Sequence, residues 1–196
     1  MTRYIKNLRS CEAKKTTKHL SDLSNDPVSV SKRKSFSSKA EFKDWCADNN
    51  TDHVFYSYCE GDSPAERISN KNPVNRCFGF VADYDAPINY IEVEDIARSA
   101  FAITPTWVSQ TFSGYVRFVW EFESIPVDPG LYDIFIKDIA RAIKAPKAIA
   151  GFDESSYKPN QYFELGSNWI KTGDLVPQEV VRTSLLSCGN KTSCIY

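Results

Sequence analysis

The fold is decided by two stretches, FGFVADYD at residues 78–85 and TWVSQTFSGYVRFVWEF at residues 106–122. Both are rich in branched and aromatic residues, which is typical of β-strands. Ser113-Gly114, near the middle of the second stretch, favours the tight turn of a hairpin. The sequence therefore predicts a first strand over 78–85 and a hairpin with strands over 106–112 and 115–122.

Helical patterns follow the first strand and the hairpin. Apolar residues recur three and four positions apart within 93–102 and again within 131–143. Residues 161–165 have the composition of a last strand. The resulting order, β-α-β-β-α-β, is that of ferredoxin-like and RNA-recognition-motif (RRM) folds. We therefore predict an α+β fold with a ferredoxin/RRM-like palm over about residues 77–166, in which the last strand returns beside the first and the sheet has one open face.

An N-terminal α/β extension precedes the palm. Ser38-Lys-Ala-Glu41 fits a capping box, so a helix is predicted over 38–48, and residues 53–58 have the composition of a strand. The predicted organisation is a basic, loosely ordered arm, a main domain, and a C-terminal helix and tail, at residues 1–37, 38–176 and 177–196.

Charge is unevenly distributed along the chain. The 196 residues include 24 Lys and Arg and 25 Asp and Glu, a formal net charge of -1. Residues 1–44 hold 11 of the basic and 5 of the acidic residues, so a basic arm precedes an acidic body. Such an arm is equally compatible with a path for single-stranded DNA and with a role in solubility alone.

Segments that direct a chain to membranes or secretion are not found. No apolar run reaches the roughly 18 residues of a membrane helix, and the N-terminus lacks the apolar core of a signal peptide. The six cysteines form no Cys-x-x-Cys pair and have no His at zinc-ligand spacing. We expect free thiols, no membrane association and a cytoplasmic protein, in the host cytoplasm if the chain is phage-encoded.

Carboxylates gather on the predicted open face. Alternate side chains of a strand share a face, so Asp83 and Asp85 point away from the helices, as Arg117 does in the hairpin. Asp153, between the second helix and the last strand, is expected to join them. Such oxygen ligands suit Mg2+ or Mn2+, and a pair of ions would activate a hydroxyl and stabilise a leaving phosphate. The side chains expected to face the helices instead are Phe78, Phe80, Ala82, Tyr84, Val116, Phe118, Trp120 and Phe122.

Phosphate oxygens have predicted partners on the same side. Arg117 offers a bidentate fork, and the Ser113-Gly114 turn offers backbone N–H groups. Taken singly, each feature has a simpler interpretation, because Asp-x-Asp is often a solvated strand end and Arg117 could pair with Glu121 on a wet sheet face. Their joint occurrence within one β-α-β-β-α-β unit favours the functional interpretation. The aromatic residues mostly serve the core, which disfavours a sheet that stacks RNA bases.

Three motifs of the chain resemble those of the archaeo-eukaryotic primase superfamily, particularly the small primase-polymerase domains of phages and plasmids. Phe80-Val-Ala-Asp83-Tyr-Asp85 resembles its first motif, a strand that ends in Asp-x-Asp. The turn at Ser113-Gly114 followed by Arg117 resembles its second, with Arg at the place of a His. Gly151-Phe-Asp153 and then Gln161 to Asn168 resemble its third, with Gln161 at the place of an Arg. The resemblance covers about residues 53–172.

The resemblance implies a template-directed nucleotidyltransferase, a DNA primase or primase-polymerase of mobile-element replication. Its implied partners are nucleoside triphosphates, a single-stranded DNA template and a replicative helicase. Asp83, Asp85 and Asp153 would be catalytic and would bind Mg2+ or Mn2+. The implied nucleotide-binding residues are Ser113, Gly114, Arg117, Gly166 and Asn168. The basic residues that fit a nucleic-acid path are Arg67, Lys71, Arg76, Lys158 and Lys171.

Two alternatives remain open. A replication initiator or origin- or single-strand-binding protein on the same fold would have little or no polymerase activity, and the departures at Arg117 and Gln161 motivate it. A metal-dependent glycosyltransferase would use Asp-x-Asp for a sugar nucleotide. It ranks last, because that fold usually needs a longer α/β domain.

Overall fold

A computed structural model describes residues 3–8, 30–36, 54–63, 68–86, 88–111, 114–164 and 167–192 of the chain. Its elements are β1 (Arg3–Leu8), β2 (Val30–Phe36), β3 (Val54–Ser57), β4 (Cys59–Gly61), β5 (Val74–Asp83), the 3-10 turn η2 (Tyr90–Glu92), α3 (Val93–Ser99), β6 (Trp107–Gln110), β7 (Val116–Pro126), α4 (Tyr132–Ile143), α5 (Ala145–Ala148), the 3-10 turn η3 (Glu154–Tyr157), β8 (Phe163–Glu164), β9 (Ser167–Lys171) and α6 (Gln178–Thr192).

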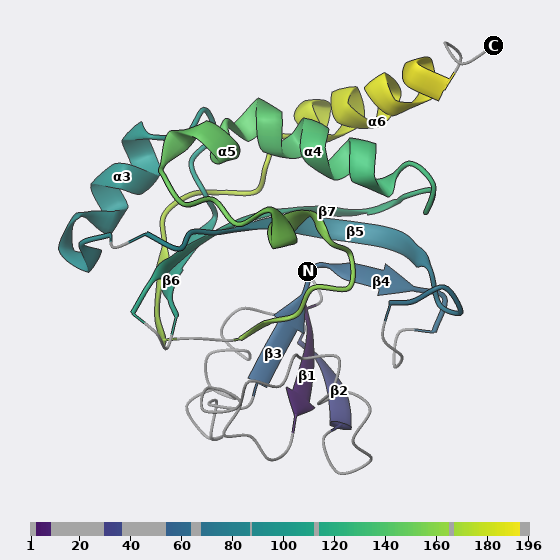
Figure 1. Cartoon of the computed structure of the whole chain (residues 1–196), viewed down its shortest axis with the longest axis horizontal. Coiled ribbons are helices and arrows are strands. Elements are labelled where there is room, and N and C mark those ends of the chain that lie inside the picture. Colours follow the sequence, from purple (N-terminus) through teal and green to yellow (C-terminus); the bar gives the residue numbers. More distant parts are fainter. Residues whose placement is uncertain are drawn as a thin grey trace.

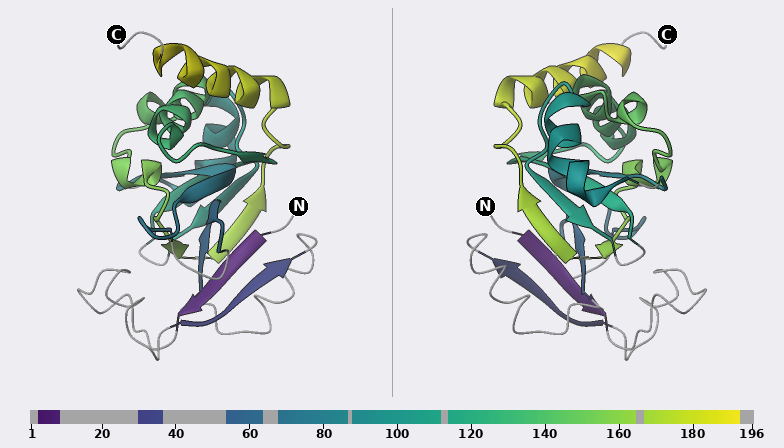
Figure 2. Two further views of the ribbon diagram at one scale, coloured as in Figure 1. Left: turned by 90° about the vertical axis from the view of Figure 1, so that its right-hand side faces the viewer. Right: turned by 90° about the vertical axis from the view of Figure 1, so that its left-hand side faces the viewer.

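Two sheets and a layer of helices make up the fold. The larger sheet has the strand order β4-β5-β7-β6-β9, and all its neighbours are antiparallel. The smaller sheet has the order β2-β1-β3-β8. Helices α3, α4, α5 and α6 lie on one side of the larger sheet, and β1, β2 and β3 lie on the other (Figure 1). Side views show the same three layers (Figure 2).

The helix-facing side of the larger sheet is an apolar core, as its alternation predicts. Val116, Phe118, Trp120 and Phe122 of β7 are completely buried there. Helix α4 begins one residue after the predicted start and ends at the predicted Ile143. Its buried side chains include Phe135 and Ile139. Each such side chain contributes about 1.5–3 kcal/mol by leaving water, so this layer holds β5 and β7 in place.

The opposite side of the larger sheet is covered, and the prediction of an open face is wrong over much of it. A second, aromatic cluster fills the space between the sheets. Its buried members are Tyr56, Tyr58, Phe78, Val81, Trp107, Val119 and Phe163. Glu121 is completely buried among them, where its carboxylate accepts hydrogen bonds from the Tyr58 hydroxyl at 2.8 Å and the Trp107 indole at 3.1 Å. Arg117 is 4% exposed and does not lie on a wet surface.

The last strand of the predicted palm belongs to the other sheet. Within residues 161–164, the described part of this segment, the strand is the two-residue β8, which pairs with β3. The place beside β5 is taken by β4, a strand that the sequence pattern did not indicate. The strand order β5-β7-β6 is nevertheless the one that a ferredoxin-like unit has for its first three strands. The reason for the difference is local, since a two-residue segment forms too few ladder bonds to dictate its own partner.

Phe78 faces the opposite side from the one predicted. The register between β5 and β7 shifts between Cys77 and Gly79, where two steps along β5 match four steps along β7, and such an irregularity interrupts the alternation of side chains. Phe78 therefore packs in the aromatic cluster, while Phe80, Ala82 and Tyr84 face the helices as predicted. A β-bulge leaves no clear signal in the alternation of a run this apolar.

Regular elements are found near both ends of the chain. Strands β1 and β2 occupy part of the stretch 1–37, for which a loosely ordered arm is predicted. The helix predicted over 38–48 lies outside the described residues. Helix α6 begins at the predicted place and continues to Thr192. None of the helices in the described ranges is long and apolar enough to span a bilayer.

Candidate active site

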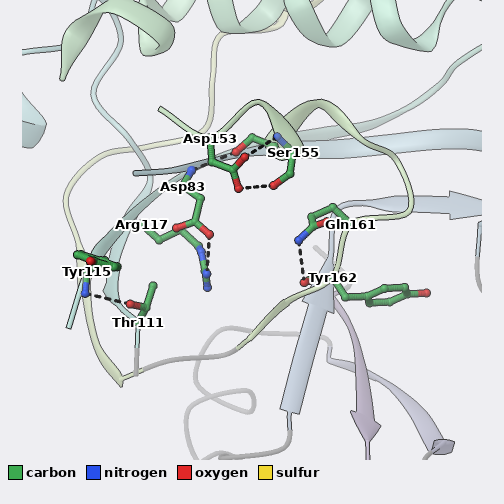
Figure 3. Close-up of polar contacts among 9 residues, drawn as sticks. Asp83, Thr111, Tyr115, Arg117, Asp153, Ser155, Gln161 and Tyr162 are labelled. Carbon is green, nitrogen blue, oxygen red and sulfur yellow. Dashed lines mark hydrogen bonds and ion pairs between the residues drawn. The ribbon is translucent and has the colours of Figure 1, made fainter. Parts of the chain in front are cut away.

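Two backbone segments lie side by side at the end of β5 and bring the predicted carboxylates together. The Asp85 amide donates to the Gly151 carbonyl at 2.8 Å, and the Asp153 amide donates to the Asp83 carbonyl at 2.9 Å. Between these two bonds Tyr84 and Phe152 form an antiparallel bridge. Residues directly opposite in such a pair have Cβ atoms about 4.5–5.5 Å apart. Asp83 and Asp153 are therefore cross-strand neighbours, as Figure 3 shows.

The bridge residues anchor this pairing in the core. The rings of Tyr84 and Phe152 lie 5.7 Å apart, edge to face, and the Tyr84 hydroxyl donates to the Ala145 carbonyl at 2.6 Å. Because both rings point toward the helices, their neighbours in each segment point to the other face. This places all three predicted carboxylates on one side of the sheet.

Gly151 allows the close approach of the two segments. Its φ is +79°, a conformation that side chains disfavour. A Cβ at this position would lie 3.1 Å from the Asp85 carbonyl carbon and 3.1 Å from the Ala86 Cβ. Glycine therefore lets the chain turn and leaves room opposite Asp85.

Asp153 is oriented by the turn that follows it. Its carboxylate caps η3, accepting from the Ser155 amide at 2.8 Å and from the Ser155 hydroxyl. The next residue, Ser156, is buried, and its hydroxyl accepts from the Asp83 amide at 3.2 Å. The turn thereby holds both aspartates from one short segment.

Arg117 and Asp83 form a largely buried ion pair. The residues are partners in the β5–β7 register, and the Nη2 atom of Arg117 lies 2.9 Å from Oδ2 of Asp83, with side chains 5% and 20% exposed. The guanidinium also lies over the Phe163 ring, 5.2 Å from its centroid, which favours a cation. Burial raises the pKa of the Tyr56 phenol, while the nearby Arg117 charge opposes that rise. Arg117 is thus enclosed between a carboxylate and aromatic side chains of the smaller sheet.

Asp85 is the accessible carboxylate of the group. It is exposed, and its pKa is raised by partial burial, then by the charges of Asp83 and Asp153, with Arg117 opposing the rise. Both neighbouring charges act on Asp85 because the three carboxylates lie in one region. Three carboxylates against one guanidinium leave an excess of negative charge there.

The donor chemistry of this region fits a divalent cation. Carboxylate oxygens are the ligands that Mg2+ and Mn2+ prefer, and a bound cation would relieve the repulsion that raises the pKa of Asp85. Arg117 contacts the Oδ2 atom of Asp83 at 2.9 Å. Within the described ranges, however, no three His, Cys, Asp or Glu side chains are already arranged as metal ligands.

A cavity lies beside Asp153. It has a volume of about 470 Å³ and is open to solvent. Among its lining residues are Asp153, Lys158 and Lys137, and the Lys137 ammonium lies 5.7 Å from the centroid of the Tyr157 ring. Lys158, predicted from sequence to contact nucleic acid, therefore lines the same cavity as Asp153.

The remaining predicted nucleotide-binding residues are only partly described. Gly114 lies in the β6–β7 turn with φ of +90°, and its amide donates to the Thr111 carbonyl at 3.0 Å. Asn168 lies in β9. Gln161 leads into β8, and its side-chain amide donates to the Tyr162 carbonyl at 3.5 Å (Figure 3). Ser113 and Gly166 lie outside the described residues.

The predicted basic path is not brought together as a whole. Arg76 is exposed at the start of β5, seven positions before Asp83, and its Nε donates to the Ser124 hydroxyl at 3.1 Å. Lys71 is exposed before the same strand. Lys171 ends β9 at the opposite edge of the sheet, 3.2 Å from Asp174. Arg67 lies outside the described residues.

Residues of the smaller sheet and of β6 complete the surroundings of Arg117 and were not predicted. Tyr56 and Phe163 are register partners in β3 and β8. Ser109 lies opposite Arg117 in β6, and its hydroxyl is buried with no hydrogen-bond partner among the described residues. The strand alternation places Ser109 on the Arg117 face and could have identified it. Tyr56 and Phe163 come from another sheet, and no local pattern indicates them.

Comparisons with known proteins give one distant similarity. No protein-family model and no curated protein matches the chain. Among solved structures, the chain is similar to the AEP domain of the cyanophage S-2L primase-polymerase (PrimPol). The identity is 15%, the match covers 94% of this chain and 88% of that chain, and the TM-score is 0.49. A similarity this distant assigns no function by itself.

Proposed function

We propose that the chain is a template-directed nucleotidyltransferase of the primase-polymerase kind, which joins nucleotides on a single-stranded DNA template with the help of Mg2+ or Mn2+. The observation that carries the proposal is the backbone pairing of residues 83–85 with 151–153. It brings together the three carboxylates of two motifs that lie some 70 positions apart in the sequence. A strand end or a loop cap would not require this pairing.

Each residue of the site has a part in the proposed reaction. Asp83, Asp85 and Asp153 would hold divalent cations, which supply charge stabilisation for the attacking hydroxyl and the leaving phosphate. Ser155 and Ser156 keep two of these aspartates in position through the turn after Asp153. Arg117 pairs with Asp83 and is buried, so it would orient that carboxylate, and its predicted contact with a phosphate oxygen would require this ion pair to open. Lys158, at the edge of the cavity beside Asp153, would contact the template or the incoming nucleotide.

A second candidate function is a replication initiator or single-strand-binding protein without polymerase activity. The observation that favours it is the buried Arg117–Asp83 ion pair, because it uses an oxygen of a proposed metal ligand. A guanidinium also remains charged near pH 7, so it cannot act as the neutral imidazole of the related motif does. DNA binding would then depend on basic residues such as Lys158 and not on the carboxylates.

The two functions are separated by an assay with a matched pair of variants. Purified protein is given a single-stranded template, labelled nucleoside triphosphates, and Mg2+ or Mn2+. Asp85→Asn is the informative variant, because Asp85 is exposed and the change removes one charge with little effect on packing. Asp95→Asn is the control, since Asp95 is 91% exposed on α3 and away from the site.

We expect product from the natural chain and the Asp95→Asn variant, and a loss of about 100-fold or more in Asp85→Asn, since one metal ligand is worth several kcal/mol in the transition state. Equal synthesis by both variants would show that these carboxylates are not the reaction centre. Tight DNA binding without any product from the natural chain would support the initiator function instead.

A further inference from the structure

Two cysteines lie directly opposite each other in the larger sheet. Cys59 of β4 and Cys77 of β5 are Cα partners in an antiparallel register. Both are free thiols, and both belong to the core cluster on the helix-facing side. Cross-strand partners that share a face have neighbouring side chains. Their pairing is a property of the tertiary structure, because the two positions lie 18 apart in the sequence.

The hydrogen-bond pattern gives this pair the closer of the two antiparallel spacings. The Phe78 amide donates to the Tyr58 carbonyl at 3.0 Å, which makes Tyr58 and Phe78 a hydrogen-bonded pair. Pairs alternate along an antiparallel ladder, so Cys59 and Cys77 form a non-hydrogen-bonded pair, with Cα atoms about 4.5 Å apart. That value is inside the range of about 4.4–6.8 Å that disulfides span.

The thiols are buried together. Cys77 is 0% and Cys59 is 6% exposed. The Cys59 thiol donates to the Tyr132 hydroxyl at 3.1 Å, and the Cys77 thiol donates to the Gly79 carbonyl at 3.4 Å. Burial, followed by the neighbouring Cys59 thiol, raises the pKa of Cys77 well above its usual value. Each sulfur is therefore held beside the other in the reduced form.

We propose that Cys59 and Cys77 are a cross-strand dithiol that closes to a disulfide when the protein meets a low-molecular-weight disulfide. The Cys59 thiolate attacks one sulfur of the oxidant, which forms a mixed disulfide and releases one small thiol. The Cys77 thiolate then attacks the Cys59 sulfur, forms the intrachain bond and releases the second small thiol. The oxidant gains the two electrons that the cysteines lose, and the two thiol protons end on the released thiols.

Access to the pair comes from the edge of the sheet. Strand β4 is the outermost strand and has only three residues, and short edge segments open more readily than central ones. Cys59 lines a cavity of about 10 Å³, which is no larger than one water. The oxidant therefore reacts during opening of β4, and Cys59 is the first thiol to attack it because Cys59 is the more exposed.

The dithiol is separate from the proposed active site. Cys77 lies six residues before Asp83 on β5, about 20 Å along the strand, and none of its contacts involves a carboxylate of the site. The proposal therefore does not depend on the proposed function and is tested without any measurement of activity.

The test is oxidation of the folded chain by oxidised glutathione, followed by peptide mapping in a mass spectrometer. The natural chain is compared with a variant in which Cys11, Cys46, Cys188 and Cys194 are replaced by Ser. In both proteins we expect a peptide pair joined through Cys59 and Cys77, reversed by dithiothreitol. In the variant both remaining thiols should disappear together, without retained glutathione.

A single-cysteine control distinguishes closure from simple modification. Cys77→Ala in the four-Ser variant leaves Cys59 without a partner, so a stable glutathione adduct at Cys59 is expected. The proposal is overturned if the same adduct persists when Cys77 is present. It is also overturned if both thiols survive in the folded chain for a time in which the urea-unfolded chain becomes oxidised. Mapping of the natural chain decides the question if the four-Ser variant does not fold.

Discussion

Both faces of the larger sheet are buried, but one is lined by apolar side chains and the other by charged and aromatic side chains. On the helix-facing side, β7 presents Phe118 and Trp120 to the helices, where apolar side chains pack together. On the side that faces the smaller sheet, the same strand presents Arg117 and Glu121 to an aromatic cluster. One strand therefore serves an apolar core and a polar, enclosed layer at alternate positions.

The two faces differ in whether they hold buried charged groups. An apolar core tolerates no unpaired charge, whereas the second layer holds Arg117 against Asp83 and Glu121 against Tyr58 and Trp107. Groups held in this way are already desolvated and oriented, which is what a binding or catalytic site requires. The apolar face supplies rigidity, and the polar face holds charged groups in fixed positions.

The largest effect is expected on the apolar face. Phe118 is completely buried, so Phe118→Ala should lower the free energy of unfolding by about 3–5 kcal/mol through lost burial and a cavity. Tyr115, in the same hairpin and 37% exposed, is the control, and Tyr115→Ala should change it by about 0.5 kcal/mol or less. Urea unfolding of both variants measures the difference. Equal effects would contradict the expectation that burial on the apolar face stabilises the fold.

On the polar face, the ion pair should be tested by a double-mutant cycle. Arg117→Met leaves Asp83 without its cation, and because Asp83 is 20% exposed we expect a loss of about 2–3 kcal/mol, less than for a fully buried pair. The added change Asp83→Asn should recover part of that loss in urea unfolding. Strictly additive effects would show that the two side chains are not coupled.

A backbone substitution tests what brings the carboxylates together. Gly151→Ala places a Cβ at φ of +79°, 3.1 Å from the Asp85 carbonyl carbon, so a loss of about 1–2 kcal/mol is expected. Gly130→Ala is the control, because its Cβ would meet only the Asp128 carboxylate, at 3.2 Å. Chemical denaturation compares the two, and faster hydrogen exchange at the Asp85 and Asp153 amides should accompany the Gly151 change alone.

The smallest expected effect is a stabilisation, in contrast to the three losses above. Burial and the charges of Asp83 and Asp153 raise the pKa of Asp85, so the folded state loses stability as pH rises through that pKa. Asp85→Asn removes the ionisation, and it should raise the melting temperature slightly at neutral pH in the presence of a chelator. The gain should shrink as the pH falls below the usual range of aspartate. A gain that is constant with pH would rule out the electrostatic origin.

With added Mg2+ or Mn2+, we expect the natural chain to have a higher melting temperature than Asp85→Asn. A cation bound by the carboxylates would stabilise the natural chain by mass action and would act less on Asp85→Asn. Thermal unfolding with and without the metal measures this directly, without any assay of synthesis. A metal-induced shift that is the same in both proteins would place the cation elsewhere.

The sequence alone determined the main strands and helices between residues 78 and 143 and the face on which most of their side chains lie. Alternation in β7 predicted that Phe118 and Trp120 face the helices and that Arg117 does not, and the spacing in α4 predicted its buried side. It also placed Asp83 and Asp85 on one face and selected Asp153 as their partner. These are local properties, because strand and helix periodicity depend only on backbone geometry.

Only the tertiary structure decided what covers each face. Tyr56 and Phe163 enclose Arg117 from the smaller sheet, β4 takes the place that residues 161–165 were predicted to fill, and Cys59 meets Cys77 across two strands. A short strand finds its partner through contacts made by distant segments, and a bulge such as the one near Phe78 reverses a face without changing composition. Periodicity tells which side chains share a face, but the partner of that face depends on the packing of the whole chain.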